Sequence, residues 1–241
     1  SGFPVMLRSL SWLLVCGCVA VSAVADEPAG DKSAALTGQG PATAAAETAD
    51  FFKRPAVQSE ARVSVVRQGD AEIPLVVVKG TPYEMGRQLG QALKQQITTF
   101  LPAALPAICK ELGLTEEQLQ EVWSRSSAYS DDRLEQELAG VADGTGLPLR
   151  TLQAMHAVPL LMPYSCSSIA AWGEATEDGH LYQTRNLDWN LELGAHNFAA
   201  IVIYVPDVGS PHVVPTFAGF SGAHTGMNFH GIALSEMGDA S

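Results

Sequence analysis

Residues 166–188 read CSSIAAWGEATEDGHLYQTRNLD, and the turn inside this stretch decides how the chain folds. Residues 167–172 predict a strand, Asp178-Gly179 is typical of a hairpin turn, and residues 180–185 predict the returning strand. A hairpin places its two strands side by side in antiparallel order. The stretch therefore predicts that residue 166 and residues near 190 meet at one end of a sheet.

Further short apolar runs separated by turns predict additional strands. These candidate strands are residues 63–66, 73–79, 198–205, 212–217 and 232–235. Short strands joined by tight turns are typical of an antiparallel sheet. Such a sheet needs more strands and a helical cover to bury both of its faces. We therefore expect the sheet to be incomplete at Ser241, with its remainder on sequence beyond this residue.

The segment before the hairpin has a helical pattern. Thr81 with Glu84 forms a capping box, which predicts a helix start. An apolar residue then recurs every four positions and predicts one buried stripe: Met85, Leu89, Leu93 and Ile97. Gly86 and Gly90 lower the helix propensity of this segment, so we expect another element to pack closely against them.

Three more helix signals follow. A second capping box joins Thr115 to Gln118, a third helix is predicted from Asp131 to Gly144, and Pro148 begins a fourth. Residues 81–157 are thus predicted to be mostly helical. The chain as a whole is predicted to have an α+β fold.

The composition excludes some classes of protein. The 241 residues carry 26 acidic and 14 basic side chains, a net charge of −12, which argues against a nucleic-acid partner. Four cysteines are too few for a disulfide-dense scaffold. Neither a phosphate-binding glycine loop nor a metal-ligand spacing is present, so we predict no cofactor and no metal.

Residues 6–25 are predicted to be a secretory signal peptide. Arg8 precedes an uncharged run, and Ala23-Val24-Ala25 is a small-x-small cleavage site. This pattern predicts an exported, periplasmic or secreted, protein cleaved near Ala25. A lipid-modified Cys18 or a retained anchor is the alternative. Residues 26–60 are rich in Ala, Gly, Thr and Pro without a hydrophobic period, and are predicted to be a disordered linker.

Cys166 stands where the helical segment ends and the hairpin begins. Arg185 and Asp188 lie on the return strand, so the hairpin should bring both near Cys166. A nearby arginine favours the thiolate, which is the nucleophilic form of cysteine. An aspartate can orient a neighbouring amine or a donor group of a substrate. These residues predict a cysteine nucleophile at the end of the sheet.

Several segments in this order resemble the penicillin acyltransferase-like group of N-terminal-nucleophile hydrolases, which is related to bile-salt hydrolases and acid-ceramidase-like amidases. The central segments are 164–169 (YSCSSI) and 185–189 (RNLDW). Residues 80–86 (GTPYEMG) and 137–142 (ELAGVA) are similar to the pro-segment of this group, and residues 226–228 (GMN) resemble its Gly-Met-Asn turn. The resemblance extends from about residue 76 to the end of the chain.

The resemblance implies an αββα-type fold and a self-processed enzyme. Residues 61–165 would be a helical pro-segment, and residues 166–241 the start of an antiparallel-sheet catalytic domain. Cleavage between Ser165 and Cys166 would free an α-amine on the residue that carries the thiol. That amine titrates near neutral pH and can act as a base. The thiolate would then attack an amide carbonyl and form an acyl-enzyme, which water or an amine resolves.

The same resemblance implies roles for other residues. Arg185 and Asp188 would hold the amine and the substrate, and Asn228 would contribute to the oxyanion hole. Two features depart from the family pattern: Ser165 stands where many members have glycine, and a further Asn and Arg would fall beyond Ser241. The implied partners are a small-molecule amide and the chain's own cleaved fragment, with a homo-oligomer left open.

Other interpretations of the same residues remain open. Cys166 could be a structural thiol or form a disulfide with Cys109, although Cys109 is more typical of a helix core. Arg185 and Asp188 could be a surface ion pair, and Asn228 a turn residue. Ser221 lies in a near match to the nucleophile elbow of serine esterases. The alternative functions are therefore a serine esterase using Ser221 or a non-catalytic exported binding protein of the same fold.

Overall fold

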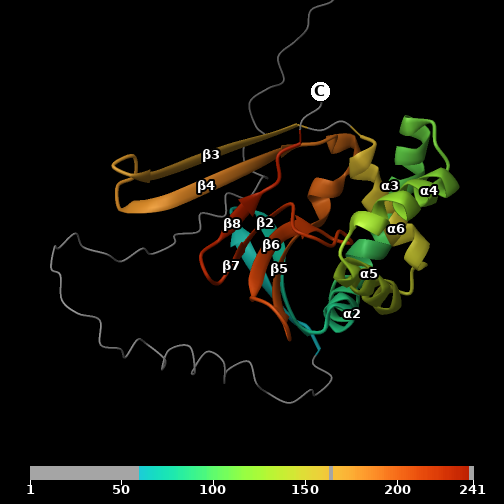
Figure 1. The fold of residues 1–241 in the computed structure, drawn as a ribbon, viewed down its shortest axis with the longest axis horizontal. Helices are drawn as coiled ribbons and strands as arrows, with labels where there is room; N and C mark the ends of the chain where they lie inside the picture. Colours follow the sequence, from blue (N-terminus) through green and yellow to red (C-terminus); the bar gives the residue numbers. More distant parts are fainter. Residues whose placement is uncertain (1–59, 163–164, 239–241) are drawn as a thin grey trace, which may run out of the picture.

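The computed structural model describes residues 60–162 and 165–238 and contains a six-stranded sheet beside a group of helices (Figure 1). The order of strands in the sheet is β1-β2-β5-β6-β7-β8. Their bounds are β1 Arg62–Gln68, β2 Ala71–Gly80, β5 Ala199–Pro206, β6 His212–Phe217, β7 Thr225–Asn228 and β8 Ala233–Ser235. All but β7 lie where the apolar runs predicted strands, and β7 was not predicted. The signal peptide and nearly all of the linker predicted for residues 6–60 lie outside the described residues.

The prediction of an α+β fold is confirmed, but the prediction of a purely antiparallel sheet is wrong at one pair. Strands β2 and β5 run parallel, with Val76 opposite Val202 and Val78 opposite Tyr204. Parallel neighbours need a long crossover, and more than 100 residues of helices and hairpin connect these two strands. Local turn signals cannot reveal such a pairing, because they report only which strands are joined directly.

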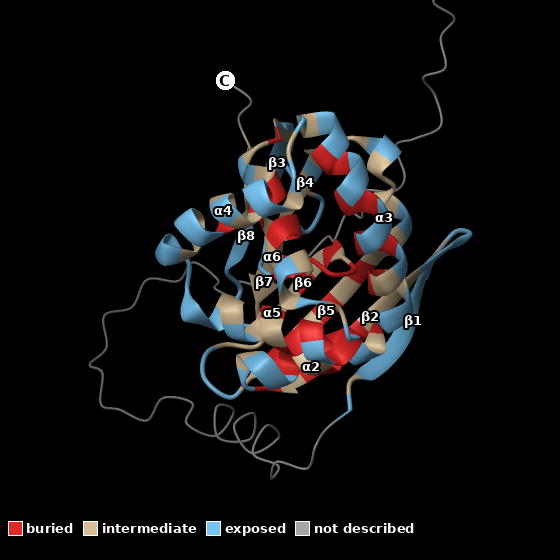
Figure 2. Ribbon diagram, turned by 90° about the vertical axis from the view of Figure 1, so that its right-hand side faces the viewer, coloured by how far each residue is buried: buried red, intermediate tan, exposed pale blue. Residues whose placement is uncertain are grey.

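Helices cover one face of this sheet (Figure 2). The helices are α2 Pro82–Ala92, α3 Lys94–Leu112, α4 Glu116–Ser126, α5 Asp132–Thr145 and α6 Leu149–Ala157, with short 3-10 turns at Ser127–Tyr129, Val158–Leu160, Leu191–Leu193 and Ala195–Phe198. Alternate residues of β2 and β5, including Val76 and Val202, are buried beneath them. The helical stripe Met85, Leu89, Leu93 and Ile97 is buried in the same core. The largest core of the described residues thus lies between the helices and the sheet.

Two details of the helices differ from the sequence prediction. The stripe is divided between two helices, because the first ends at Ala92, Leu93 caps it, and the second begins at Lys94. The third predicted helix continues past Gly144 to Thr145 and is capped by Gly146, which adopts a left-handed conformation with φ 82°. Both predicted capping boxes, at Thr81 and Thr115, are confirmed. None of the single helices described is long and apolar enough to cross a membrane; α3 and α4 pass that test only as a pair bent by 91°.

The close packing predicted at the glycines of α2 is confirmed. A Cβ atom on Gly86 would lie 2.0 Å from the carbonyl oxygen of Glu137, and one on Gly140 would lie 2.1 Å from the carbonyl oxygen of Tyr83. The backbones of α2 and α5 therefore touch where neither helix has a side chain. This contact explains why glycine stands at helical positions despite its lower helix propensity.

Strands β3 (Ser165–Gly173) and β4 (Gly179–Asp188) form a separate two-stranded hairpin. It projects past the six-stranded sheet, away from the helices (Figure 1). Apolar side chains on this hairpin are exposed, with Ile169 at 72% and Trp172 at 64% of full exposure. The predicted hairpin is confirmed, and it forms a second β layer rather than a part of the main sheet.

Candidate active site

The hairpin places Cys166 opposite Leu187, near the end where β3 begins. Cys166 is half-buried, while Ser165, the residue before it, is exposed and lies opposite Asp188. In an antiparallel pair, two residues directly opposite each other project from the same face, and so does every second residue along each strand. By this alternation Cys166, Ser168, Arg185 and Leu187 share one face of the hairpin. That face carries both the thiol and the guanidinium.

Arg185 contacts the thiol of Cys166 directly. Its Nη2 atom lies 3.0 Å from Cys166 Sγ, within hydrogen-bonding distance of the sulfur. The Arg185 side chain is only 7% exposed, so its charge is poorly screened by water. A guanidinium beside a cysteine sulfur is an arrangement found at reactive cysteines. Cys166 and Arg185 are therefore the candidate catalytic pair.

Glu236, which the sequence analysis did not single out, anchors Arg185. Its Oε2 atom lies 3.1 Å from Arg185 Nη2, and its backbone oxygen accepts a hydrogen bond from Arg185 Nε at 3.2 Å. The backbone N–H of Glu236 donates to the carbonyl oxygen of His224 at 2.7 Å. Glu236 follows β8 directly and is separated from Arg185 by 51 residues. No local motif signals this pair, since it depends on where β8 joins the sheet.

Asp188 and Asn228 lie in different surroundings from the thiol. Asp188 is exposed and, by strand alternation, lies on the other face of the hairpin from Cys166. The side-chain oxygen of Asn228 accepts hydrogen bonds from the backbone N–H groups of His230 and Ile232, both at 3.0 Å. Asn228 thus stabilises the turn between β7 and β8, as the alternative interpretation expected. In residues 60–162 and 165–238 neither side chain hydrogen-bonds to Cys166 or Arg185.

Ser221 lies in a different environment from that of an esterase nucleophile. It is 5% exposed, and its backbone N–H donates to Nε2 of His156 at 2.9 Å. The Nδ1 atom of His156 lies 2.7 Å from the carbonyl oxygen of Leu152, so both ring nitrogens are engaged with the backbone. Burial lowers the pKa of His156 to about 4. Burial keeps this histidine neutral, and because both ring nitrogens are engaged with the backbone, neither is left to activate the Ser221 hydroxyl.

The two described cysteines, Cys109 and Cys166, are both free thiols. Cys109 is buried at the end of α3, and this burial raises the pKa of its thiol. In the described part of the chain no group of three or more His, Cys, Asp or Glu residues is arranged to hold a metal ion.

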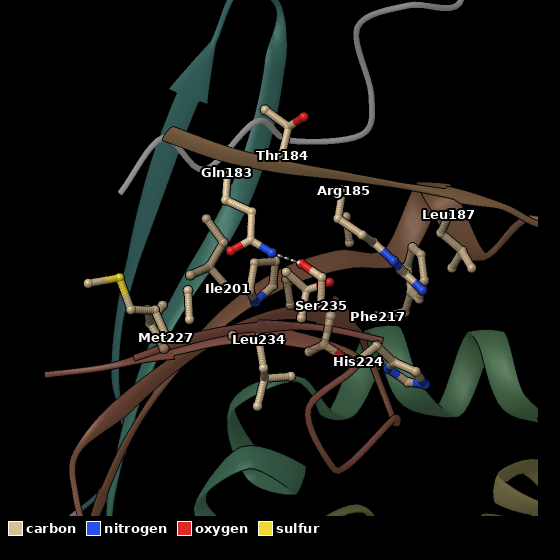
Figure 3. A pocket seen from close by; sticks show the side chains of 18 of the residues that line it. Gln183, Thr184, Arg185, Leu187, Ile201, Phe217, His224, Met227, Leu234 and Ser235 are labelled. Atoms are coloured by element: carbon tan, nitrogen blue, oxygen red, sulfur yellow. Dashed lines mark hydrogen bonds between the residues drawn. The ribbon is translucent and has the colours of Figure 1, made fainter. Parts of the chain in front are cut away.

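A cavity of about 270 Å³ opens beside Arg185, between the hairpin and the six-stranded sheet (Figure 3). The sheet face that lines it is the one not covered by helices, because Ile201 and Val213 alternate with the buried Val202 and Val214. Its walls are mainly apolar and include Leu187, Ile201, Val213, Phe217, Met227 and Leu234. Arg185 is the only Lys, Arg, Asp or Glu among the residues that line it.

Polar side chains gather on part of this cavity wall. His224 lies near Arg185 in Figure 3, and Gln183 donates a hydrogen bond to Ser235 Oγ at 3.0 Å. Burial lowers the pKa of His224, with a further contribution from the positive charge of Arg185. The imidazole is therefore neutral at pH 7.

Comparison with known proteins finds two curated relatives in Dictyostelium discoideum. The chain is 31% identical to Protein dcd1B over 204 residues, which cover 73% of this chain and 41% of the relative. It is 27% identical to Protein dcd1A over 194 residues, which cover 67% of this chain and 43% of that relative. The chain thus spans about two fifths of the length of these curated relatives. No family model matches the sequence.

Proposed function

We propose that this protein is an amide hydrolase or N-acyltransferase with a cysteine nucleophile that is activated by self-cleavage. The observation that carries the proposal is the distance of 3.0 Å between Arg185 Nη2 and Cys166 Sγ at the start of β3. The layer order of helices, sheet and hairpin is compatible with the first three layers of an αββα sandwich. The sequence motifs around Cys166 and Arg185 support the same reaction class.

Self-cleavage would occur at the peptide bond between Ser165 and Cys166. In this step the Cys166 thiol attacks the Ser165 carbonyl carbon, the C–N bond breaks, and the Cys166 nitrogen receives the proton. Water then hydrolyses the resulting thioester, which leaves a carboxylate on Ser165 and frees the Cys166 thiol. Ser165 is exposed, so water can reach this bond. The product is a Cys166 residue that carries both a thiol and a free α-amine.

The new α-amine supplies the base that an amide nitrogen cannot provide. Its ordinary pKa is about 7.7–8.0, so a substantial fraction is unprotonated near neutral pH. It would take the thiol proton as sulfur attacks the substrate carbonyl, and return a proton to the leaving nitrogen. Water or an acceptor amine would then release the acyl group from sulfur. Arg185 would stabilise the sulfur as it loses its proton and again when it leaves the acyl group.

The remaining motif residues have supporting roles in the proposal. Asp188 would orient the new α-amine, because it lies opposite Ser165, next to the bond that is cut. Asn228 would contribute to the oxyanion hole through its side-chain N–H group, since its side-chain oxygen is engaged in the turn. The cavity beside Arg185 would hold the acyl part of the substrate, and its apolar walls favour an uncharged acyl group.

The proposal also includes export and two chains in the mature enzyme. The signal-peptide pattern at residues 6–25 supports a periplasmic or secreted location. The fragment that ends at Ser165 and the fragment that begins at Cys166 would remain associated. A non-catalytic binding protein of the same fold is the competing function.

Intact mass and N-terminal sequencing of the purified protein test self-cleavage. A new N-terminus at Cys166 is expected in the wild type and in the matched control Cys109→Ala, but not in Cys166→Ala. A panel of acyl 4-nitroanilides then tests hydrolysis, with Cys166→Ala as the inactive reference. A chain that stays uncut after long incubation and cleaves no amide would favour the binding protein. Activity lost in Ser221→Ala but kept in Cys166→Ala would favour the serine esterase.

A further inference from the structure

His224 has an uncommitted polar side chain on the wall of the cavity. It lies just before β7 and lines the cavity together with Arg185 (Figure 3). In residues 60–162 and 165–238 neither of its ring nitrogens makes a hydrogen bond. Its ring instead packs edge-on against Phe220, with ring centres 6.3 Å apart. A half-buried imidazole placed in this way has a hydrogen-bonding nitrogen to offer to a ligand.

A backbone hydrogen bond holds His224 close to the residues around the Arg185 guanidinium. The carbonyl oxygen of His224 accepts the backbone N–H of Glu236 at 2.7 Å, and Glu236 in turn contacts Arg185 through two hydrogen bonds. Arg185 then contacts Cys166 Sγ. His224 is thus linked to Cys166 through two residues, Glu236 and Arg185, each in contact with the next.

The chemistry of the neighbouring groups determines what His224 can bind. The guanidinium of Arg185 has only donors, so it can meet the acceptor atoms of a substrate but not its N–H group. A neutral imidazole has one nitrogen that accepts a hydrogen bond. The charge of Arg185 disfavours a proton on His224, which keeps that acceptor available. A secondary amide has one hydrogen-bond donor at the scissile bond, its N–H group. A buried donor without an acceptor weakens binding.

We propose that His224 is a substrate-binding residue that accepts the N–H of the scissile amide, and that it makes the site selective for secondary amides over tertiary amides and esters. This inference rests on the proposed function, because it places the scissile bond at the Arg185 end of the cavity. The expected preference comes from a hydrogen bond that only the secondary amide can donate.

Matched substrates test the inference by turnover. Octanoyl 4-nitroanilide has an N–H at the scissile bond, whereas octanoyl N-methyl-4-nitroanilide and 4-nitrophenyl octanoate do not. His224→Phe keeps a ring of similar size and removes the acceptor. We expect it to lower kcat/KM for the secondary anilide by about ten- to a hundredfold and to leave the ester within about threefold. His224→Gln restores an acceptor and should recover part of the loss, and His230→Phe, at an exposed residue, is the control. An equal loss on all three substrates would overturn the inference.

A binding measurement separates this inference from the proposed function. Calorimetric titration with N-methyloctanamide and N,N-dimethyloctanamide compares a secondary and a tertiary amide without requiring turnover. The wild type should bind the secondary amide about tenfold more tightly, and His224→Phe should abolish the difference. If this discrimination is found in a protein that hydrolyses no amide, the proposed function fails and the role of His224 stands. If hydrolysis by Cys166 is found without discrimination in either experiment, the role of His224 fails and the proposed function stands.

Discussion

At the scale of single residues, the proposed chemistry depends on the contact between Arg185 and Cys166. Arg185 is 7% exposed; its Nη2 atom contacts both Cys166 Sγ and Glu236 Oε2, and its Nε donates to the backbone oxygen of Glu236. Its planar guanidinium can serve both neighbours at once, because its several N–H donors point in fixed directions. A lysine ammonium has one nitrogen, so it cannot also make the contact of Arg185 Nε with the backbone oxygen of Glu236.

Arg185→Lys should therefore slow the alkylation of Cys166 at pH 7. We expect a decrease of about three- to tenfold, since the charge beside the sulfur becomes less well placed. Labelling with iodoacetamide followed by peptide mass spectrometry measures the rate at Cys166 and at Cys109 in the same sample. Cys109 and the variant Arg67→Lys, at an exposed residue, are the controls. An unchanged or higher rate at Cys166 would show that Arg185 does not favour the thiolate.

His156 makes stability depend on pH. Its pKa is lowered from 6.5 to about 4 by burial, so the unfolded chain binds a proton at a higher pH than the folded chain. Stability is therefore lost as the pH falls from about 6.5 toward 4. Thermal unfolding between pH 7 and pH 4.5 should show this loss in the wild type and a flatter profile in His156→Gln. The control His230→Gln should follow the wild type. A wild-type Tm that is constant over this range would contradict the prediction.

At the scale of elements, the contact between α2 and α5 depends on the absence of side chains. Gly86 and Gly140 allow the two backbones to approach until a single Cβ atom would overlap a carbonyl oxygen. Tyr204 on β5 adds a hydrogen bond to Glu137 on α5 at 2.9 Å, which joins the helix layer to the sheet. Gln88 on α2 likewise bonds the backbone N–H and carbonyl oxygen of Lys79 on β2, so polar contacts join the helices to the sheet in addition to apolar packing.

Gly86→Ala should destabilise the protein strongly, although alanine favours helices. The added Cβ would meet the Glu137 carbonyl oxygen at 2.0 Å, so α2 and α5 must separate. We expect a loss of about 2–4 kcal/mol in the free energy of unfolding. Urea denaturation measures it, with Gln91→Ala on the exposed side of the same helix as the control. The control should change by less than about 0.5 kcal/mol. Equal stability of both variants would show that the helices can move apart freely.

At the scale of the whole molecule, residues on both sides of Ser165 build one sheet. Strand β2 precedes the proposed cleavage site and pairs along six residues with β5, which follows it. The helices before the site pack on the same sheet and bury Val202 and Tyr204 from β5. A cut at residue 165 therefore breaks the chain without breaking the core.

The two fragments of the cleaved protein should stay together in native buffer. Size-exclusion chromatography followed by denaturing gel electrophoresis should find both fragments in one peak. They should separate only in denaturant, because the backbone hydrogen bonds between β2 and β5 and the shared core join them. The uncut Cys166→Ala variant is the control and should elute at the same volume. Separation of the fragments in native buffer would contradict this prediction.

The sequence by itself determined the elements of this protein, because their signals are local. Both capping boxes, the hairpin turn at Asp178-Gly179 and the apolar runs of the strands predicted structure at the right positions. The hairpin also predicted that Arg185 would lie near Cys166, since a turn fixes the register of the strands it joins.

Only the tertiary structure decided the parallel pairing of β2 with β5, the ion pair of Arg185 with Glu236, and the place of His224 in the cavity. Each of these features depends on contacts between residues far apart in the chain. Such contacts are set by how whole layers pack, and no local pattern of residues specifies them.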